Sequence, residues 1–216
     1  MIELSHITKI YKTENHLKVV LDDVSYSFDS SNNYAIFGPN GAGKSTLLRL
    51  IAGAELANSG RIFRNVRVSW PLGLAAGFHQ QMTGRENLKF ISRIYGADVR
   101  RVIDYVEYFA ELGHYFDLPV RTYSSGMQSR LAYGLCMALE FDCYLVDEVT
   151  AVGDPRFRLR AKQAFDERRA RASMIMVSHS VGTAKAYCNR GLVLYRGKLL
   201  AFGHIDSAIE FYKKNF

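Results

Sequence analysis

The stretch Gly38–Ser45, which reads GPNGAGKS, constrains the fold more than any other part of the chain. The apolar run Tyr34–Phe37 precedes it, and Lys44–Gly53 follows with leucine and isoleucine at helical spacing. The pattern therefore predicts a strand, a glycine-rich turn and a helix, in that order. Glycines let consecutive backbone N–H groups point inward, and a helix N-terminus adds partial positive charge, so the turn is predicted to bind phosphate.

Two side chains of this P-loop pattern carry predicted roles toward a bound ATP. Lys44 is placed to reach the β- and γ-phosphates, and the hydroxyl of Ser45 is placed to bind Mg²⁺. A purely structural glycine turn is the alternative, but the position between a predicted strand and a predicted helix favours nucleotide binding. The predicted nucleotide contacts from this region are Gly38, Pro39, Asn40, Gly41, Ala42, Gly43, Lys44, Ser45 and Thr46.

Polar residues also follow two other apolar runs, Cys143–Val146 and Met174–Val177. Asp147 and Glu148 follow the first run. Taken alone, two carboxylates after an apolar run are more often a solvated strand end. In a chain that also has a P-loop, they indicate a Mg²⁺ ligand, Asp147, and a base that polarises the attacking water, Glu148. His179 follows the second run, either as a surface residue or as a contact of the γ-phosphate. We predict that Lys44, Glu148 and His179 are catalytic and that Ser45 and Asp147 bind the metal.

Strand and helix patterns alternate along most of the chain. Strands are also predicted at 19–28, 192–195 and 199–202, and helices at 86–95, 99–112, 125–139, 157–170, 181–188 and 205–212. This alternation predicts an α/β fold with a mainly parallel sheet. The helical block from about residue 86 interrupts it and predicts an inserted subdomain.

The composition of the chain excludes several classes of protein but does not by itself indicate a function. No stretch approaches the ~18 consecutive apolar residues of a membrane span, and the N-terminus lacks the pattern of a secretory signal, so a cytosolic protein is expected. The three cysteines lack metal-ligand or disulfide-framework spacing and are predicted to be buried thiols. The net charge of +7 suits nucleic acid, anionic lipid, phosphate ligands or solubility alone.

Taken together, these residues resemble the nucleotide-binding subunits of ABC transporters over essentially the whole chain. Tyr11 looks like the aromatic that stacks on adenine. The segment Tyr123–Met127, YSSGM, occupies the place of the family's signature motif, and Ala151–Asp154 occupies the place of its D-loop. The resemblance therefore adds nucleotide contacts at Tyr11, Ser124, Ser125, Gly126 and Asp154.

The resemblance implies a fold and a mechanism. We expect one ABC-type domain over residues 1–216, with a P-loop NTPase (RecA-like) core, an N-terminal antiparallel β subdomain and a helical subdomain at about 86–140. ATP and Mg²⁺ would be the cofactors. Two copies would clamp two ATP molecules, with Ser124 and Gly126 of one copy facing the γ-phosphate held by Lys44 of the other. Opening and closing of this homodimer would drive a separate polytopic membrane permease.

Two motifs depart from the family pattern. Ser125 and Met127 replace a glycine and a glutamine of the signature, whereas the expected phosphate contacts Ser124 and Gly126 are kept. The glutamine that senses Mg²⁺ and the permease falls at His79 or Gln80. We assign Gln80 to the metal set while leaving this choice open.

The departures also resemble one group of exporters. The signature, the DEVTAVGD segment after the catalytic strand and the WPLGL segment at 70–74 look like those of capsular polysaccharide, polysialic acid or O-antigen exporters. Capsule export is expected, with the chain at the cytoplasmic face of the inner membrane, no tight binding of polysaccharide and no nucleic acid. O-antigen or teichoic acid export, or a soluble ATPase acting on nucleic acid, are the alternatives. The basic segment 156–171 is either a solvated helix face or a contact for lipid or a partner.

Overall fold

The computed structural model describes residues 1–12, 16–72, 77–147, 154–178 and 180–216. They divide into two compact units. The first contains the described residues of 1–71, 141–147 and 172–216, and the second contains those of 72–140 and 154–171. Each unit is described by itself below.

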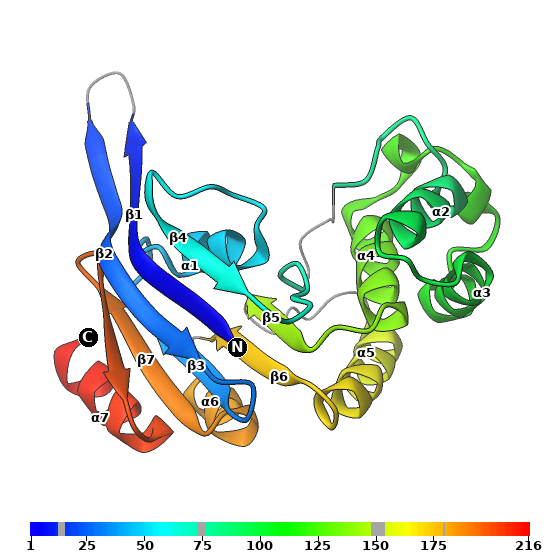
Figure 1. Ribbon diagram of the computed structural model, residues 1–216. Coiled ribbons are helices and arrows are strands. Elements are labelled where there is room, and N and C mark those ends of the chain that lie inside the picture. Colours follow the sequence, from blue (N-terminus) through cyan, green and yellow to red (C-terminus); the bar gives the residue numbers. More distant parts are fainter. Residues whose placement is uncertain (13–15, 73–76, 148–153, 179) are drawn as a thin grey trace. The chain divides into compact units, whose positions relative to one another are not determined.

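Two sheets build the first unit (Figure 1). Strands β2 (Leu17–Phe28), β1 (Ile2–Lys12) and β4 (Ser59–Arg64) pair antiparallel in that order. The second sheet has the order β5-β6-β3-β7-β8, parallel except for the β7–β8 hairpin. Its strands are β5 (Cys143–Asp147), β6 (Ser173–Val177), β3 (Asn33–Phe37), β7 (Arg190–Tyr195) and β8 (Lys198–Phe202).

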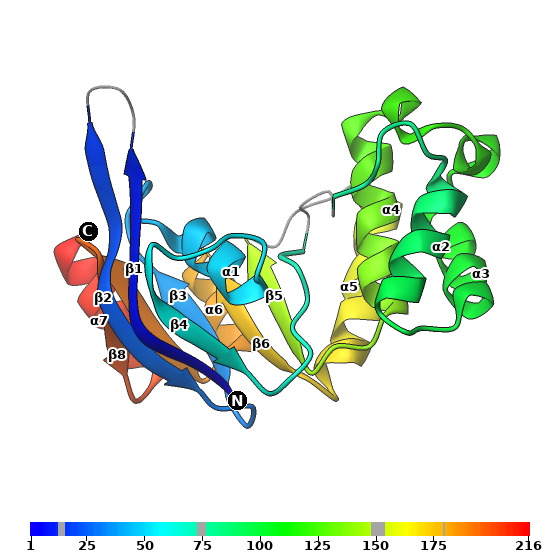
Figure 2. The ribbon, with the colours of Figure 1, turned by 45° about the horizontal axis from the view of Figure 1, so that its top comes forward.

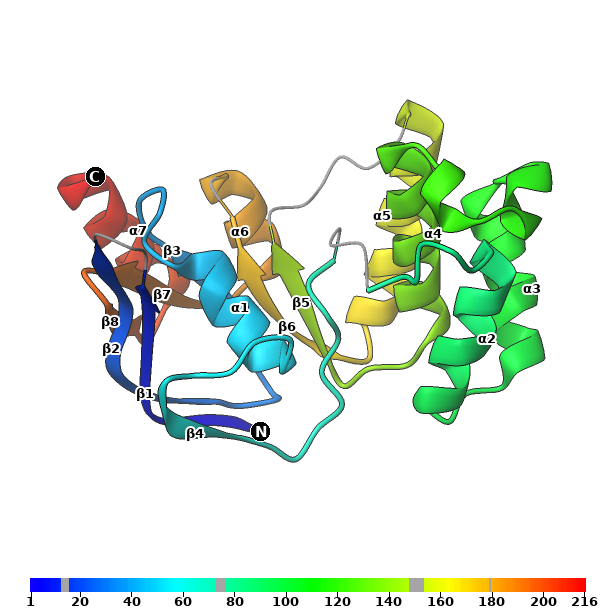
Figure 3. The same cartoon turned by 90° about the horizontal axis from the view of Figure 1, so that it is seen from above.

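Alternate residues of the larger sheet face different layers, because successive side chains of a strand point to opposite faces. The inward residues of β3, β5, β6 and β7 join a buried core with helix α1 (Lys44–Ala52) and strands β1 and β2. On β3, Ile36 belongs to this core, whereas the following residue, Phe37, points to the opposite face of the sheet. The Phe37 ring stacks on the Tyr212 ring of helix α7 (Ile205–Asn215), with 5.6 Å between the ring centroids. Helix α1 therefore lies between the two sheets, while α6 (Val181–Tyr187) and α7 cover the opposite face (Figure 3).

The second unit is helical (Figure 2). It contains α2 (Gly84–Ile94), α3 (Val99–Ala110), α4 (Ser125–Ala138) and α5 (Pro155–Arg169), with short 3₁₀ turns at Gly113–Asp117 and Val120–Thr122. Side-chain oxygens accept backbone N–H groups at the four helix starts, as N-caps do; these caps are Thr83, Asp98, Ser124 and Asp154.

Aromatic packing joins α3, α4 and α5. Phe109 of α3 stacks on Tyr133 of α4 at 6.1 Å and meets Phe157 of α5 edge-on at 5.3 Å. Gly134 permits the close approach, since a Cβ there would lie 3.2 Å from both Phe109 and Val106. Helix α5 therefore belongs to this unit, so the unit extends beyond the range of about 86–140 expected from sequence.

The predicted α/β fold with an antiparallel β subdomain and inserted helices is confirmed. Strands β1 and β4 have no counterpart among the strands predicted by range. Register shifts between Leu4 and Lys9 interrupt the alternation of β1, and β4 has no fully buried residue to mark it. All three cysteines are buried, as predicted. Among the described residues, no helix has the length and apolar character needed to cross a membrane.

Candidate nucleotide-binding site

The P-loop lies between β3 and α1, as its pattern predicts. Gly41 has a φ of 75° and Gly43 a φ of 105°, in the left-handed region that favours glycine. A Cβ on Gly43 would also lie 2.1 Å from Cγ1 of Val20. Gly43 is the N-cap of α1 and provides no side-chain acceptor, so the first N–H groups of the helix are left for a ligand such as phosphate.

Lys44 is buried and turns back over its own loop. Its Nζ donates to the backbone oxygens of Gly38 at 2.7 Å and Pro39 at 3.0 Å. Ala42 N also donates to the oxygen of Pro39 at 3.2 Å. These two hydrogen bonds hold the ammonium at the P-loop.

A cavity of about 310 Å³ opens at this end of the first unit. Its walls include eight of the predicted residues, namely Tyr11, Asn40, Gly41, Gly43, Lys44, Ser45, Thr46 and Asp147. Ser45 and Asp147 share the cavity, because the carboxyl end of β5 lies at the same sheet edge as the P-loop. Gly38, Pro39 and Ala42 are not among its lining residues; the first two hold Lys44.

The oxygen donors of the cavity fit Mg²⁺. Within the described ranges no group of three or more His, Cys, Asp or Glu side chains could hold a metal by itself. Mg²⁺ is usually bound through one or two protein oxygens together with substrate phosphates. Ser45 and Asp147 supply such oxygens beside a phosphate-binding loop.

Three lining residues are absent from the sequence-based set: Lys18, Val20 and Val177. Val20 packs beneath Gly43, and Val177 pairs with Asp147 across β5 and β6. Lys18 lies on β2 directly opposite Tyr11, and its Nζ lies 3.6 Å from the position of a Cβ on Gly41. Only the pairing of β1 with β2 places Lys18 at the cavity, and the sequence pattern does not define which strands pair.

The predicted signature residues belong to the helical unit. The Ser124 hydroxyl caps α4 by accepting Met127 N at 3.2 Å. Gly126 lies in the first turn, where a Cβ would meet only the Ser124 Oγ, at 3.9 Å. Tyr123 is buried and donates to the Tyr115 backbone oxygen at 2.7 Å, which fixes the start of the motif.

Asp154 and Gln80 also lie in this unit. The Asp154 carboxylate accepts the Arg156 and Phe157 N–H groups of α5 and forms an ion pair with Arg130. The Phe157 hydrogen bond is the main cause that lowers the pKa of Asp154. Gln80 is exposed and donates to the Phe78 backbone oxygen at 3.3 Å.

Asn87 of α2 holds the segment around His79. Its side chain is buried, accepts His79 N at 2.8 Å and donates to the His79 oxygen at 3.1 Å. The Gln80 backbone oxygen accepts Arg121 N at 3.0 Å. The backbone at His79 and Gln80 is thus fixed by Asn87 and Arg121. Glu148 and His179 lie outside the described residues.

Much of the basic segment is paired within the helical unit. Arg160 donates to Glu111 at 2.7 Å, and Arg168 donates to the Met137 backbone oxygen at 2.9 Å. Arg169 lies 3.7 Å from Asp166. The contacts of Arg160 and Arg168 therefore tie α5 to the residues at the C-terminal ends of α3 and α4.

The α/β core, the glycine-rich P-loop and the oxygen donors beside it define a P-loop nucleotide-binding protein. A family model described as ABC transporter matches residues 21–151. The chain belongs to the ABC transporter family, as its sequence motifs predict.

The sequence similarity to known proteins covers nearly the whole chain. The polysialic acid transport ATP-binding protein KpsT of Escherichia coli is 46% identical over 216 residues, which are 99% of this chain and 96% of that protein. The capsule polysaccharide export ATP-binding protein CtrD of Neisseria meningitidis serogroup B is 46% identical over 212 residues, 98% of each chain. The predicted ABC-type ATPase is confirmed by the family and these relatives.

Solved structures share the fold. The dimeric structure of a post-hydrolysis state of the ATP-binding cassette MJ0796, bound to ADP and Pi, matches this chain with a TM-score of 0.73. It is 21% identical and covers 92% of this chain and 96% of that one. An ABC transporter ATP-binding subunit has a TM-score of 0.74 at 22% identity, covering 99% and 93%.

Proposed function

We propose that this chain hydrolyses ATP as a homodimer and drives export of a capsule-type polysaccharide through a separate membrane-spanning permease. The end-to-end similarity to KpsT and CtrD carries this proposal, because the names of both proteins specify transport or export of such polymers. An O-antigen export ATP-binding protein of Klebsiella pneumoniae is 31% identical over 99% of this chain. The higher identity therefore favours a capsule polymer over O-antigen.

The P-loop cavity supports the chemistry. Lys44, which is hydrogen-bonded to the loop, binds the β- and γ-phosphates together with the N–H groups of α1. Ser45 and Asp147 would hold Mg²⁺, which would supply positive charge to neutralise the phosphates. Glu148 accepts a proton from the attacking water, and His179 donates to the γ-phosphate.

The signature supports a shared site in the dimer. Ser124, Ser125 and Gly126 of one copy face the γ-phosphate bound by the other, and Asp154 contributes from the D-loop. The start of α4 suits this role, because its backbone N–H groups and the Ser124 hydroxyl lie at an N-terminus. Gln80, or His79 beside it, links the metal to the permease.

The permease places this peripheral chain at the cytoplasmic face of the inner membrane. The chain neither binds the polysaccharide tightly nor uses nucleic acid. Co-purification tests these points: we expect salt-resistant capture with a polytopic membrane protein, and ATP hydrolysis that nucleic acid leaves unchanged. Salt-sensitive retention on DNA or RNA with strong activation would refute the proposal.

Two variants test the site. Lys44→Ala is expected to lower ATP affinity at least about tenfold, because it removes the phosphate-binding cation. Glu148→Gln is expected to keep ATP affinity while stopping turnover, so that size-exclusion chromatography with ATP shows a stable dimer. Hydrolysis at the wild-type rate by Glu148→Gln would contradict the assignment of the base.

A further inference from the structure

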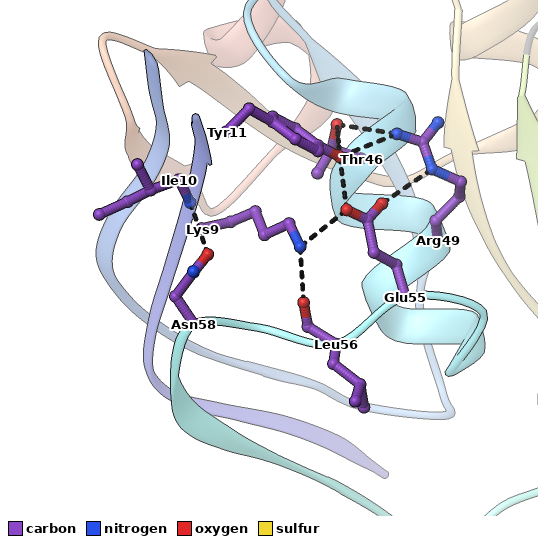
Figure 4. A network of polar contacts seen from close by, with 8 residues as sticks. All are labelled: Lys9, Ile10, Tyr11, Thr46, Arg49, Glu55, Leu56 and Asn58. Atoms are coloured by element: carbon purple, nitrogen blue, oxygen red, sulfur yellow. Dashed lines mark hydrogen bonds and ion pairs between the residues drawn. The ribbon is translucent and has the colours of Figure 1, made fainter. Parts of the chain in front are cut away.

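A partly buried polar network connects Tyr11 to the far end of α1 (Figure 4). The Tyr11 hydroxyl donates to Glu55 Oε1 at 2.6 Å and accepts from the Arg49 guanidinium at 3.2 Å. Arg49 also donates to Thr46 Oγ1 at 3.1 Å. The phenol oxygen is therefore held from two sides.

Glu55 is the centre of this network. Its carboxylate accepts from Tyr11, from Arg49 Nε at 3.0 Å and from Lys9 Nζ at 2.8 Å. The side chain is 19% exposed, and that of Lys9 is 13% exposed. Burial raises the pKa of Glu55, but hydrogen bonds from Lys9, Tyr11 and Arg49 outweigh it and lower the pKa to about 2. The carboxylate is therefore charged at neutral pH.

The spacing of these residues along β1 and α1 places their side chains on the faces that meet in the network. Lys9 and Tyr11 are two residues apart on β1 and so share a face, and Thr46 and Arg49 are three apart on α1. The loop after α1 is tied to β1 as well, because Lys9 Nζ donates to the Leu56 oxygen at 2.7 Å and Ile10 N donates to Asn58 Oδ1 at 2.7 Å.

We propose that Glu55 is a positioning residue for the nucleotide base, because it fixes Tyr11 while the tyrosine ring lines the cavity. This inference rests on the proposed function, in which Tyr11 stacks on adenine. A ring held at its hydroxyl end loses little rotational freedom on binding, and preorganisation of this kind raises affinity. Thr46, which also lines the cavity, links the same network to the P-loop helix.

The test compares two ligands of the full chain, ATP and inorganic tripolyphosphate, by calorimetry with Glu55→Gln. Base stacking contributes only to ATP, so we expect ATP affinity to fall about fivefold while tripolyphosphate affinity is unchanged. Tyr11→Phe keeps the ring but loses the hydroxyl and should match Glu55→Gln. The double variant should be no weaker than either single one, since both remove the same interaction.

Asn58→Ala is the matched control, because it loosens the same loop without touching Tyr11. It should keep the wild-type preference for ATP. An unchanged preference in Glu55→Gln, or an equal loss for both ligands, would overturn the positioning role. Failure of the wild-type chain to bind ATP would instead refute the proposed function itself, so the two failures are distinguishable.

Discussion

Tyr11 of β1 and Lys18 of β2 are direct cross-strand partners, and both line the P-loop cavity. The pairing places an aromatic ring and an ammonium group at the same wall. Since the Lys18 Nζ also lies near Gly41, it adds positive charge where phosphates are expected.

Lys18→Ala is therefore predicted to lower ATP affinity about threefold to tenfold and to weaken its salt dependence. Lys12→Ala is the control, because Lys12 lies on the same hairpin, pairs with Leu17 and is not among the cavity-lining residues. Calorimetric titration at two salt concentrations measures both effects. Equal affinities for the two variants would show that Lys18 contributes nothing.

Gly43→Ala should damage both stability and nucleotide binding. Its φ of 105° costs an alanine roughly 1–2 kcal/mol, and the added Cβ would meet Val20 at 2.1 Å. Gly113→Ala is the control, since Gly113 has a φ of 56° but nothing within 4 Å of the added atom. Urea unfolding should show a larger loss for Gly43→Ala, and only that variant should lose ATP binding.

Ser124 offers a way to separate capping from ligand contact. Aspartate caps helices about as well as serine, so Ser124→Asp should keep the wild-type melting temperature. The aspartate charge should nevertheless repel the γ-phosphate. The double variant Ser124→Asp/Glu148→Gln should therefore fail to form the ATP-dependent dimer that Glu148→Gln forms. Ser124→Ala should lose about 1 kcal/mol of stability. A dimer of normal affinity with Ser124→Asp would place the phosphate elsewhere.

The Glu55 network predicts a pH dependence of stability. Because the folded-state pKa of about 2 lies below the ordinary value of 4.5, the network stabilises the fold above pH 4.5, and this contribution decreases as pH falls toward 2. Wild type and Glu55→Gln should thus differ by on the order of 2 kcal/mol near neutral pH, and less in acid. Denaturant unfolding across pH measures this difference, and a constant difference would contradict the assigned pKa.

The sequence by itself determined the P-loop and the order of the helices and of most strands, although β1 and β4 were not predicted. Apolar runs and helical spacing involve residues close in the chain, so α1, β5 and β6 were predictable to within a residue or two. The glycine-rich turn was predictable for the same reason. The family motifs added Tyr11 and the signature, which no local periodicity marks.

Tertiary structure alone decided which distant residues meet. Lys18 and Val20 reach the cavity because β2 pairs with β1 beside the P-loop, and Glu55 meets Tyr11 across 44 positions of sequence. Helix α5 joins the helical unit through the packing of Phe157. These contacts depend on strand pairing and close packing between elements, and local sequence patterns do not specify either of them.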